Sequence, residues 1–322
     1  MTSSPSVADT FHEGERAVQA RVGAVVRERL AQMGPRVIRD FMPDQHRDFF
    51  QQLPFVLVGT VDADGQPWAS VLAAPPGFIH SPDDRHLQVQ AVPLAGDPLQ
   101  HTLVNGADIG LLGIEPHTRR RNRMNGVVQN RGNAGFEVVL RQSFGNCPKY
   151  IQAREPLFVD VPATTPVVHE SAELDAATRR MVSQADTFFI ATAYAGEREA
   201  TGAAGGVDVS HRGGKPGFVR VDADGMLTVP DFLGNFFFNT LGNLTVNPRA
   251  GLLFMDFESG DLLYLAVNAE IVWEGAELQA FEGAQRLLKL KVVSSRRVEA
   301  ALPLRWGAAE LSPVLAGTGQ WA

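Results

Sequence analysis

Cysteine is almost absent from this chain of 322 residues, which carries Cys147 alone. A single thiol excludes an intrachain disulfide, and it excludes a metal site built from several cysteines. Nothing in the composition therefore requires an oxidising compartment, and we expect the protein to act in the reducing cytoplasm.

Long apolar runs and excess positive charge are missing as well. No stretch approaches the roughly 20 apolar residues that span a bilayer, and the first ten residues, MTSSPSVADT, lack the features of a secretory signal. We expect no membrane partner. The chain has 29 Lys and Arg against 36 Asp and Glu, and this balance argues against nucleic acid as a partner.

What the sequence does contain is an internal duplication. Three landmarks recur in the same order in each half: FVLVGTV (55–61) and FFIATA (188–193), PPGFI (75–79) and KPGFV (215–219), DIGLLG (108–113) and RAGLLF (249–254). The alignment places Thr60 on Thr192 and Gly110 on Gly251. Ordered landmarks with drifting offsets indicate a repeated domain with loop insertions. We predict domains at 1–165 and 166–322.

Each half has the same predicted order of elements. An amphipathic helix at 44–53 or 173–185 precedes short runs rich in Val, Ile, Phe and Thr, and DADG turns at 62–65 and 222–225 predict hairpins. This pattern is typical of a mainly β (α+β) fold built from small barrels. Apolar spacing over 14–35 predicts one further helix, which ends at Gly34-Pro35.

The stretch SHRGGKPGFVRV (210–221) places cations among glycines directly before a predicted strand. Because glycine lets backbone N–H groups come close to an anion, the loop suits a phosphate. The alternative is a surface hairpin that needs glycine for its turn and lysine for solubility.

The second half, from this loop through PD, GN, NP and GLLF, resembles the FMN-binding split barrels of the pyridoxamine 5'-phosphate oxidase-like superfamily. FHEGERAVQARVG and TRRRNRMNG in the first half resemble longer bacterial members, so the resemblance covers roughly 11–306. It implies two tandem six-stranded split β-barrels with flanking helices. It also implies FMN at an interface between two barrels, which a tandem chain can form within itself. Two chains can still pair as a homodimer.

The resemblance also implies phosphate and ring contacts in the second half. Ser210, Arg212 and Lys215 would contact the FMN phosphate, since arginine clamps phosphate and lysine acts as a point charge. The backbone of 229–231 (Val229, Pro230 and Asp231) would follow the isoalloxazine edge.

Two asparagines of the second half, Asn235 and Asn243, have two possible roles. They would either cap the next helix or reach the phosphate, where the amino-terminal end of the helix favours negative charge.

The run TRRRNR (118–123) supplies two further candidates, Arg121 and Arg123. They either cross the barrel interface to the flavin, or form ion pairs with the acids of the second barrel. Nucleic acid is disfavoured because no aromatic platform accompanies the run. Short family members carry an arginine at the position of Ala266, and the alignment assigns Arg123 as its counterpart in the first half.

The stretch FGNCPKYIQ (144–152) adds Lys149 and Gln152 as candidates for flavin contact. Cys147 has no base at a recognisable spacing, which favours a small buried thiol over a nucleophile. His12 and Glu13 either close over the site or serve the fold. The sequence assigns no catalytic residue and no metal ligand.

The flavin would carry the chemistry, so we expect an FMN-dependent oxidoreductase that exchanges a hydride with a small substrate or a nicotinamide donor. Activity as a pyridoxamine phosphate oxidase is not expected, because the carboxy-terminal substrate-phosphate signature is missing. Two alternatives stay open. One is a flavin-binding redox partner that works with a separate reductase, and the other is a haem-binding split barrel that uses one of the eight histidines.

Overall fold

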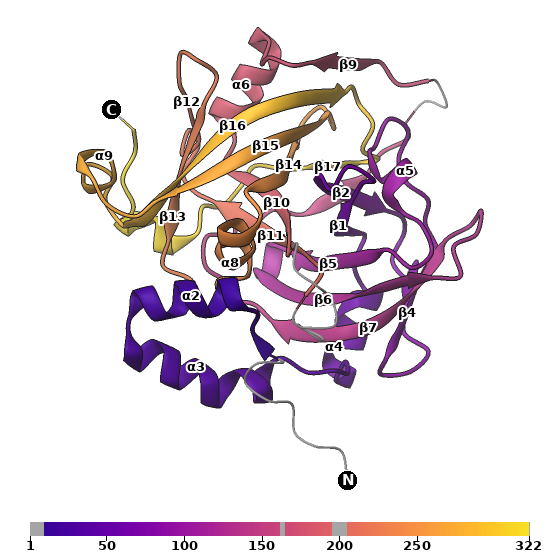
Figure 1. Cartoon of the computed structure of the whole chain (residues 1–322). Coiled ribbons are helices and arrows are strands. Elements are labelled where there is room, and N and C mark those ends of the chain that lie inside the picture. The colour runs from indigo at the N-terminus through magenta and orange to yellow at the C-terminus, as the bar shows by residue number, and fades with distance from the viewer. Residues whose placement is uncertain (1–9, 162–164, 195–204, 322) are drawn as a thin grey trace.

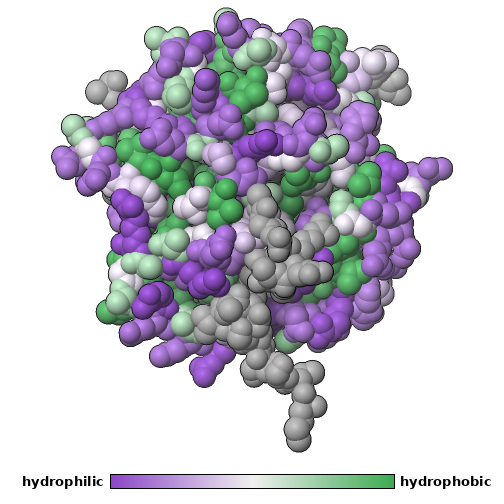
Figure 2. All heavy atoms as spheres, viewed as in Figure 1, coloured by the Kyte–Doolittle hydropathy of each residue, from purple (hydrophilic) through white to green (hydrophobic). Residues whose placement is uncertain are grey.

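The computed structural model describes residues 10–161, 165–194 and 205–321 (Figure 1). Two antiparallel sheets dominate it, and each sheet belongs to one half of the chain. Figure 1 shows the first half, in indigo and magenta, against the second half, in orange and yellow. Figure 2 shows a largely hydrophilic face with scattered apolar residues. No helix among the described residues has the length and apolar character needed to cross a membrane.

The first sheet has the strand order β2-β1-β5-β6-β7-β4-β3. Its strands are β1 (Phe55–Val61), β2 (Pro67–Ala73), β3 (Ile79–His80), β4 (His86–Val89), β5 (Asp108–Glu115), β6 (Arg120–Gln129) and β7 (Phe136–Gly145). The helix α4 (Asp44–Gln51) precedes this sheet, as predicted, and the short helix α5 (Leu99–Thr102) precedes β5.

The second sheet has the order β11-β10-β14-β15-β16-β13-β12, with β9 (Val168–Ser171) added beside β16. Its other strands are β10 (Thr187–Ala193), β11 (Val207–Gly213), β12 (Arg220–Val221), β13 (Leu227–Phe232), β14 (Arg249–Met255), β15 (Leu262–Val272) and β16 (Ala284–Val298). Its helices are α6 (Ala176–Gln184), α8 (Asn239–Val246) and α9 (Ala276–Gln279).

The two sheets share one topology. In each half the spatial order is second, first, fifth, sixth, seventh, fourth and third strand. Each order contains six strands of four or more residues plus one strand of two residues, β3 or β12. The predicted mainly β fold of two tandem split barrels is confirmed. The pair β8 (Pro156–Phe158) and β17 (Leu304–Trp306) links the end of the first half to the end of the second.

The predicted amino-terminal helix is wrong in its bounds. The segment forms two helices, α2 (Glu13–Val22) and α3 (Ala24–Val37), which meet at Gly23. Gly23 has φ 142°, a conformation that residues with a Cβ rarely adopt. Pro35 lies inside α3 and does not end it. A proline near the carboxyl end of a helix removes one N–H but leaves only a few residues to follow.

The barrels contact each other through backbone rather than through side chains at two equivalent glycines. A Cβ on Gly110 in β5 would lie 2.5 Å from the carbonyl oxygen of Val207 in β11. A Cβ on Gly251 in β14 would lie 2.2 Å from the carbonyl oxygen of Pro67 in β2. Both distances are shorter than a Cβ contact can be, so only glycine allows this approach.

Apolar side chains fill the rest of the interface. Phe55, Val71 and Leu112 of the first barrel pack with Phe189 and Leu253 of the second, in one continuous buried cluster. Each barrel also has its own core on the other side of its sheet. The two halves therefore bury apolar surface against each other as well as within themselves.

The acid Asp97 lies inside this interface. The Asp97 carboxylate accepts hydrogen bonds from the Ser70 hydroxyl at 2.6 Å, the Leu99 N–H at 2.7 Å and the Tyr264 hydroxyl at 2.8 Å. Burial raises the pKa of Asp97 from 3.8 to about 6, although these three donors oppose the shift. Tyr264 belongs to the second barrel, so the acid joins both halves.

The close approach predicts that Gly251→Ala destabilises the fold, because the new methyl must displace the backbone of β2. We expect a loss of about 1–3 kcal/mol in the free energy of unfolding, measured by urea denaturation. Gly307→Ala is the matched control, since a Cβ there meets nothing within 4 Å. Equal stability of the two variants would contradict the packing described.

The buried acid predicts a pH dependence. Because its pKa is higher in the folded chain, Asp97 favours folding below about pH 4 and loses this contribution as the pH rises through 6. Relative to Asp97→Asn, the wild type should lose about 3 kcal/mol over this interval. Urea unfolding of both proteins at pH 4, 5, 6 and 7 measures the difference. A stability difference that stays constant with pH would be the contrary result.

Candidate functional site

A cavity opens where the two barrels meet. The first barrel contributes the start of β6 and the segment 146–150, and the second contributes the ends of β11 and β13 and the segment 234–241 that leads into α8. The cavity itself has a volume of about 110 Å³, and it is open to solvent on one side.

Three guanidinium groups give the cavity a positive character. Arg121 and Arg123 come from β6 of the first barrel, and Arg212 comes from β11 of the second. Burial, together with the charges of Arg123 and Arg212, lowers the pKa of Arg121 to about 9. Its Nε donates to the carbonyl of Cys147 at 2.7 Å. An anion in the cavity would relieve the repulsion among these cations.

Arg123 is buried and crosses to the second barrel. Its Nη1 lies 3.0 Å from Asp208 Oδ1 in an ion pair, and its Nη2 donates to the Ser210 hydroxyl. One interpretation of the arginine run was a set of ion pairs with the acids of the second barrel. Arg123 forms such a pair. The Arg123 Nε has no hydrogen-bond partner among the described residues.

Arg212 faces an acid within the second barrel. Its Nε lies 3.5 Å from Asp231 Oδ1, and Arg286 Nε lies 3.4 Å from Asp231 Oδ2. Neither Nε atom makes a hydrogen bond to any described residue. One carboxylate therefore stands between two guanidiniums, and the cavity keeps a net positive charge.

Aromatic residues in strained backbone form the rim. Tyr150, Phe236 and Phe238 have φ values of 63°, 65° and 64°, in the left-handed region that bulky residues avoid. The Tyr150 ring stacks on Phe232 with 5.1 Å between centroids. Strain of this kind concentrates at binding sites, where the surrounding structure holds it in place.

Eight of the twelve residues predicted from the sequence line this cavity: Arg121, Arg123, Lys149, Ser210, Arg212, Pro230, Asp231 and Asn235. The chain thus brings together the arginine run of the first half and the glycine-rich loop of the second. The prediction of direct ligand contact by these eight residues stays a prediction.

The other four do not line it. Lys215 turns to the carboxy-terminal segment, where its Nζ donates to the carbonyl of Thr318 at 2.6 Å. Val229 is buried in the core of the second barrel. The Gln152 amide donates to the Gly214 carbonyl and accepts from the Ser312 N–H.

Asn243, the fourth, is buried one turn into α8. Its amide nitrogen donates to Asp208 Oδ2 at 2.9 Å and to Thr192 Oγ1 at 3.1 Å. It therefore supports the acid that holds Arg123 and does not cap the helix. The Asn235 side chain does accept from the N–H of Phe237 at 3.1 Å, as a local cap of the loop.

The structure also corrects the alignment of the two halves around Arg123. Gly110 pairs with Asn125 across β5 and β6, whereas Gly251 pairs with Ala266 across β14 and β15. The counterpart of Ala266 is therefore Asn125, and the counterpart of Arg123 is Tyr264. The sequence alignment was wrong by two residues in β6 and β15. Strand pairing gives the correct equivalence, because the fifth and sixth strands pair in the same register in both halves.

Several lining residues were not predicted. Asn239, Thr240 and the aromatic pair Phe236 and Phe238 precede or begin α8. The run GNFFFN could have pointed to these residues, because three adjacent aromatic residues in a loop are unusual at a protein surface. Cys147, expected to be a buried thiol, is instead partly exposed at the cavity.

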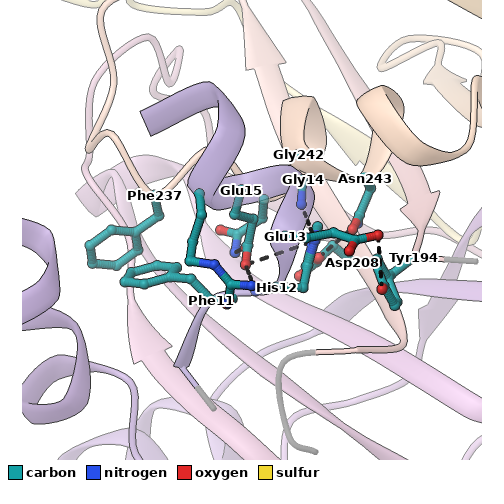
Figure 3. A network of polar contacts seen from close by, with 12 residues as sticks. Phe11, His12, Glu13, Gly14, Glu15, Tyr194, Asp208, Phe237, Gly242 and Asn243 are labelled. Atoms are coloured by element: carbon teal, nitrogen blue, oxygen red, sulfur yellow. Dashed lines mark hydrogen bonds and ion pairs between the residues drawn. The ribbon is translucent and has the colours of Figure 1, made fainter. Parts of the chain in front are cut away.

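A buried polar network lies behind the cavity, between α2 and α8 (Figure 3). Glu15 accepts from the Asn239 amide at 2.6 Å and from the His12 N–H at 3.0 Å. Burial and the nearby charge of Asp208 raise the pKa of Glu15 well above its usual range. Burial lowers the pKa of His12, whose Nδ1 accepts from the Gly14 N–H and caps α2.

Close helix packing holds this network together. A Cβ on Gly14 would lie 2.2 Å from the Gly242 carbonyl oxygen, so α2 rests directly on the backbone of α8. The Glu13 carboxylate accepts from the Tyr194 hydroxyl at 3.3 Å. His12 and Glu13 therefore serve the fold, and neither lines the cavity.

The buried ion pair yields a prediction. Asp208→Asn leaves Arg123 buried without its counter-charge, so we expect a loss of about 3–5 kcal/mol in unfolding free energy, measured in urea. Arg123→Met in the same chain should restore part of it, which a double-mutant cycle quantifies. Asp40→Asn, in the exposed pair with Arg85, is the control and should cost at most about 1 kcal/mol. Equal losses for Asp208→Asn and Asp40→Asn would refute the buried pair.

Comparison with known proteins gives one family and a group of solved structures. The family described as pyridoxamine 5'-phosphate oxidase matches residues 42–155. No curated protein matches the chain. The match falls in the first half, whereas the most specific motifs stand in the second.

Three of the similar solved structures are small proteins. A point variant of HupZ from Group A Streptococcus is 14% identical, with 38% of this chain and 98% of that chain covered and a TM-score of 0.30. HutZ, the heme storage protein from Vibrio cholerae, is 16% identical, with 39% and 95% covered and a TM-score of 0.27. A FAD-binding protein from Mesorhizobium loti is 16% identical, with 41% and 98% covered and a TM-score of 0.25.

The family match agrees with the resemblance predicted from the motifs and with the shared strand order of the two barrels. Residues 42–155, which comprise α4 and the first barrel, match the family described as pyridoxamine 5'-phosphate oxidase.

Proposed function

We propose that the chain binds FMN in the cavity between its barrels and acts as an FMN-dependent oxidoreductase. The observation that carries this proposal is the convergence of Arg121, Arg123 and Arg212, from both barrels, on one cavity. Buried guanidiniums this close to one another favour an anion, and guanidinium is the side chain best suited to phosphate.

The donor set fits a phosphate monoester joined to a flat ring. Besides the guanidiniums, Ser210, Asn146 and Thr240 line the same cavity. Buried Asn146 Nδ2 and Arg123 Nε have no partner among the described residues, and unpaired buried donors cost about 1–3 kcal/mol each. Phosphate oxygens would accept from such donors.

The residues divide between binding and shielding. Arg121 and Arg212 would hold the phosphate, while Asp208 holds Arg123, whose Nη2 donates to the Ser210 hydroxyl. The rim of Tyr150, Phe236 and Phe238, with Phe232 stacked on Tyr150, would cover the ring and exclude water. When bound, FMN supplies reversible hydride acceptance from a small substrate or a nicotinamide donor.

A redox partner that receives electrons from a separate reductase is the other form of this proposal. Turnover with NADH or NADPH alone would favour the oxidoreductase, whereas turnover only with an added reductase would favour the partner protein. In both cases the cavity takes residues from both barrels of the chain.

Haem is a second candidate, and His211 is the observation that favours it. This residue is buried and lines the cavity. Burial and the charges of Arg121, Arg212 and Arg154 lower the pKa of His211 well below its usual range, so the imidazole is neutral. A neutral imidazole can ligate iron, and guanidiniums can pair with propionates.

Absorbance spectra of the purified protein, before and after addition of FMN or haem, test the proposal. We expect a flavin spectrum and FMN in the extract. Arg212→Ala and Arg121→Ala should each weaken FMN binding about 10–100-fold, as expected for loss of a charged hydrogen bond to phosphate. Arg27→Ala, on the exposed face of α3, is the control. An unchanged Kd in both cavity variants, or a Soret band instead, would count against FMN.

A further inference from the structure

The duplication provides an internal comparison for the cavity. Strand pairing places equivalent residues without reference to any other protein: Val58 pairs with Ser70 in the first half, and Ile190 pairs with Ser210 in the second. Because Thr60 and Thr192 are equivalent, so are Val58 and Ile190, and hence Ser70 and Ser210. Two residues further along, Leu72 is equivalent to Arg212.

The same reasoning applies to the sixth strands. Leu112 pairs with Arg123 in the first half, and Leu253 pairs with Tyr264 in the second. Arg123 is therefore equivalent to Tyr264, and Arg121 to Leu262. The cavity lies between β6 of the first barrel and β11 of the second. The equivalent position therefore lies between β15 of the second barrel and β2 of the first.

At that second position the residues equivalent to the three arginines are all buried. Leu72, Leu262 and Tyr264 are equivalent by strand register to the three arginines of the cavity, and each has 0% exposure. Leu262 and Tyr264 pack in the apolar cluster between the barrels, whereas Leu72 packs in the core of the first barrel. The Ser70 hydroxyl, equivalent to the cavity's Ser210, donates to Asp97, and the Tyr264 hydroxyl donates to the same carboxylate. Both hydroxyl donors are therefore used within the protein.

The charge of the two positions is also opposite. The cavity holds Arg121, Arg123 and Arg212 against Asp208 and Asp231. The equivalent position holds the Asp97 carboxyl, and Arg296 of β16 donates to the Gly96 carbonyl at the edge of the interface. An anion there would meet an acid and apolar carbons, which disfavour it.

We infer that the chain binds one anionic cofactor per polypeptide, and that Tyr264, Asp97 and Ser70 have turned the equivalent position into part of the core. This inference deepens the proposed function and rests on it for the identity of the anion. It makes Tyr264 and Arg123 the residues that decide which of the two positions is open.

Titration with FMN tests the stoichiometry directly. We expect saturation at one FMN per chain, measured by isothermal titration calorimetry and by FMN extracted per polypeptide. Two FMN per chain would overturn the inference and leave the proposed function standing. No FMN bound would overturn both, so the two failures are distinguishable.

Two variants test which position is closed. Tyr264→Phe removes one donor to Asp97, so it should lower Tm by a few degrees without changing the stoichiometry or the Kd for FMN. Arg123→Met combined with Asp208→Asn, which leaves no unpaired buried charge, should instead weaken FMN binding at least tenfold. An unchanged Tm in Tyr264→Phe, or an altered stoichiometry in that variant, would overturn the assignment. Because Tyr264→Phe removes only a hydroxyl group, we expect this variant to fold.

Discussion

The backbone contact between the barrels, at Gly110 and at Gly251, is the constraint on which the rest of the structure depends. At each glycine a fifth strand lies directly against the second strand of the other barrel, too close for any Cβ. This approach brings β6 of the first half near β11 of the second, and it brings β15 near β2. The cavity and its filled counterpart are both results of that spacing, because each is built where a sixth strand meets the partner's second strand.

The buried charge of Arg123 at the cavity is paired across the two barrels, so neither half could hold it alone. Arg123 belongs to β6, but its counter-ion Asp208 and its hydrogen-bond acceptor Ser210 belong to β11. Asp208 in turn accepts from Asn243 on α8, the helix on which α2 rests through Gly14. The amino-terminal helix therefore supports the cavity from behind, over a distance in sequence of more than half the chain.

Much of the fold could be predicted from the sequence, because strand periodicity, turn residues and the repeated landmarks are local signals. The arginine run and the glycine-rich loop were also recognisable, since cations among glycines or in a strand are unusual. What failed depended on long-range contacts. Nothing local shows that Lys215 meets Thr318, that Asn243 meets Asp208, or that Gly23 breaks a helix with good apolar spacing. The equivalence of Arg123 with Tyr264 is visible only from the strand register. The two sixth strands share too few identical residues to be aligned by sequence.

Joining both barrels in one polypeptide changes how the cavity depends on dilution. When two separate subunits build a shared site, the site is lost as the protein is diluted below the dissociation constant of the dimer. Here the lining residues come from one chain, and the connection between the halves keeps each barrel at a high effective concentration relative to the other. The cavity can therefore persist at the lowest cellular copy numbers, where encounter between subunits would be the limiting event.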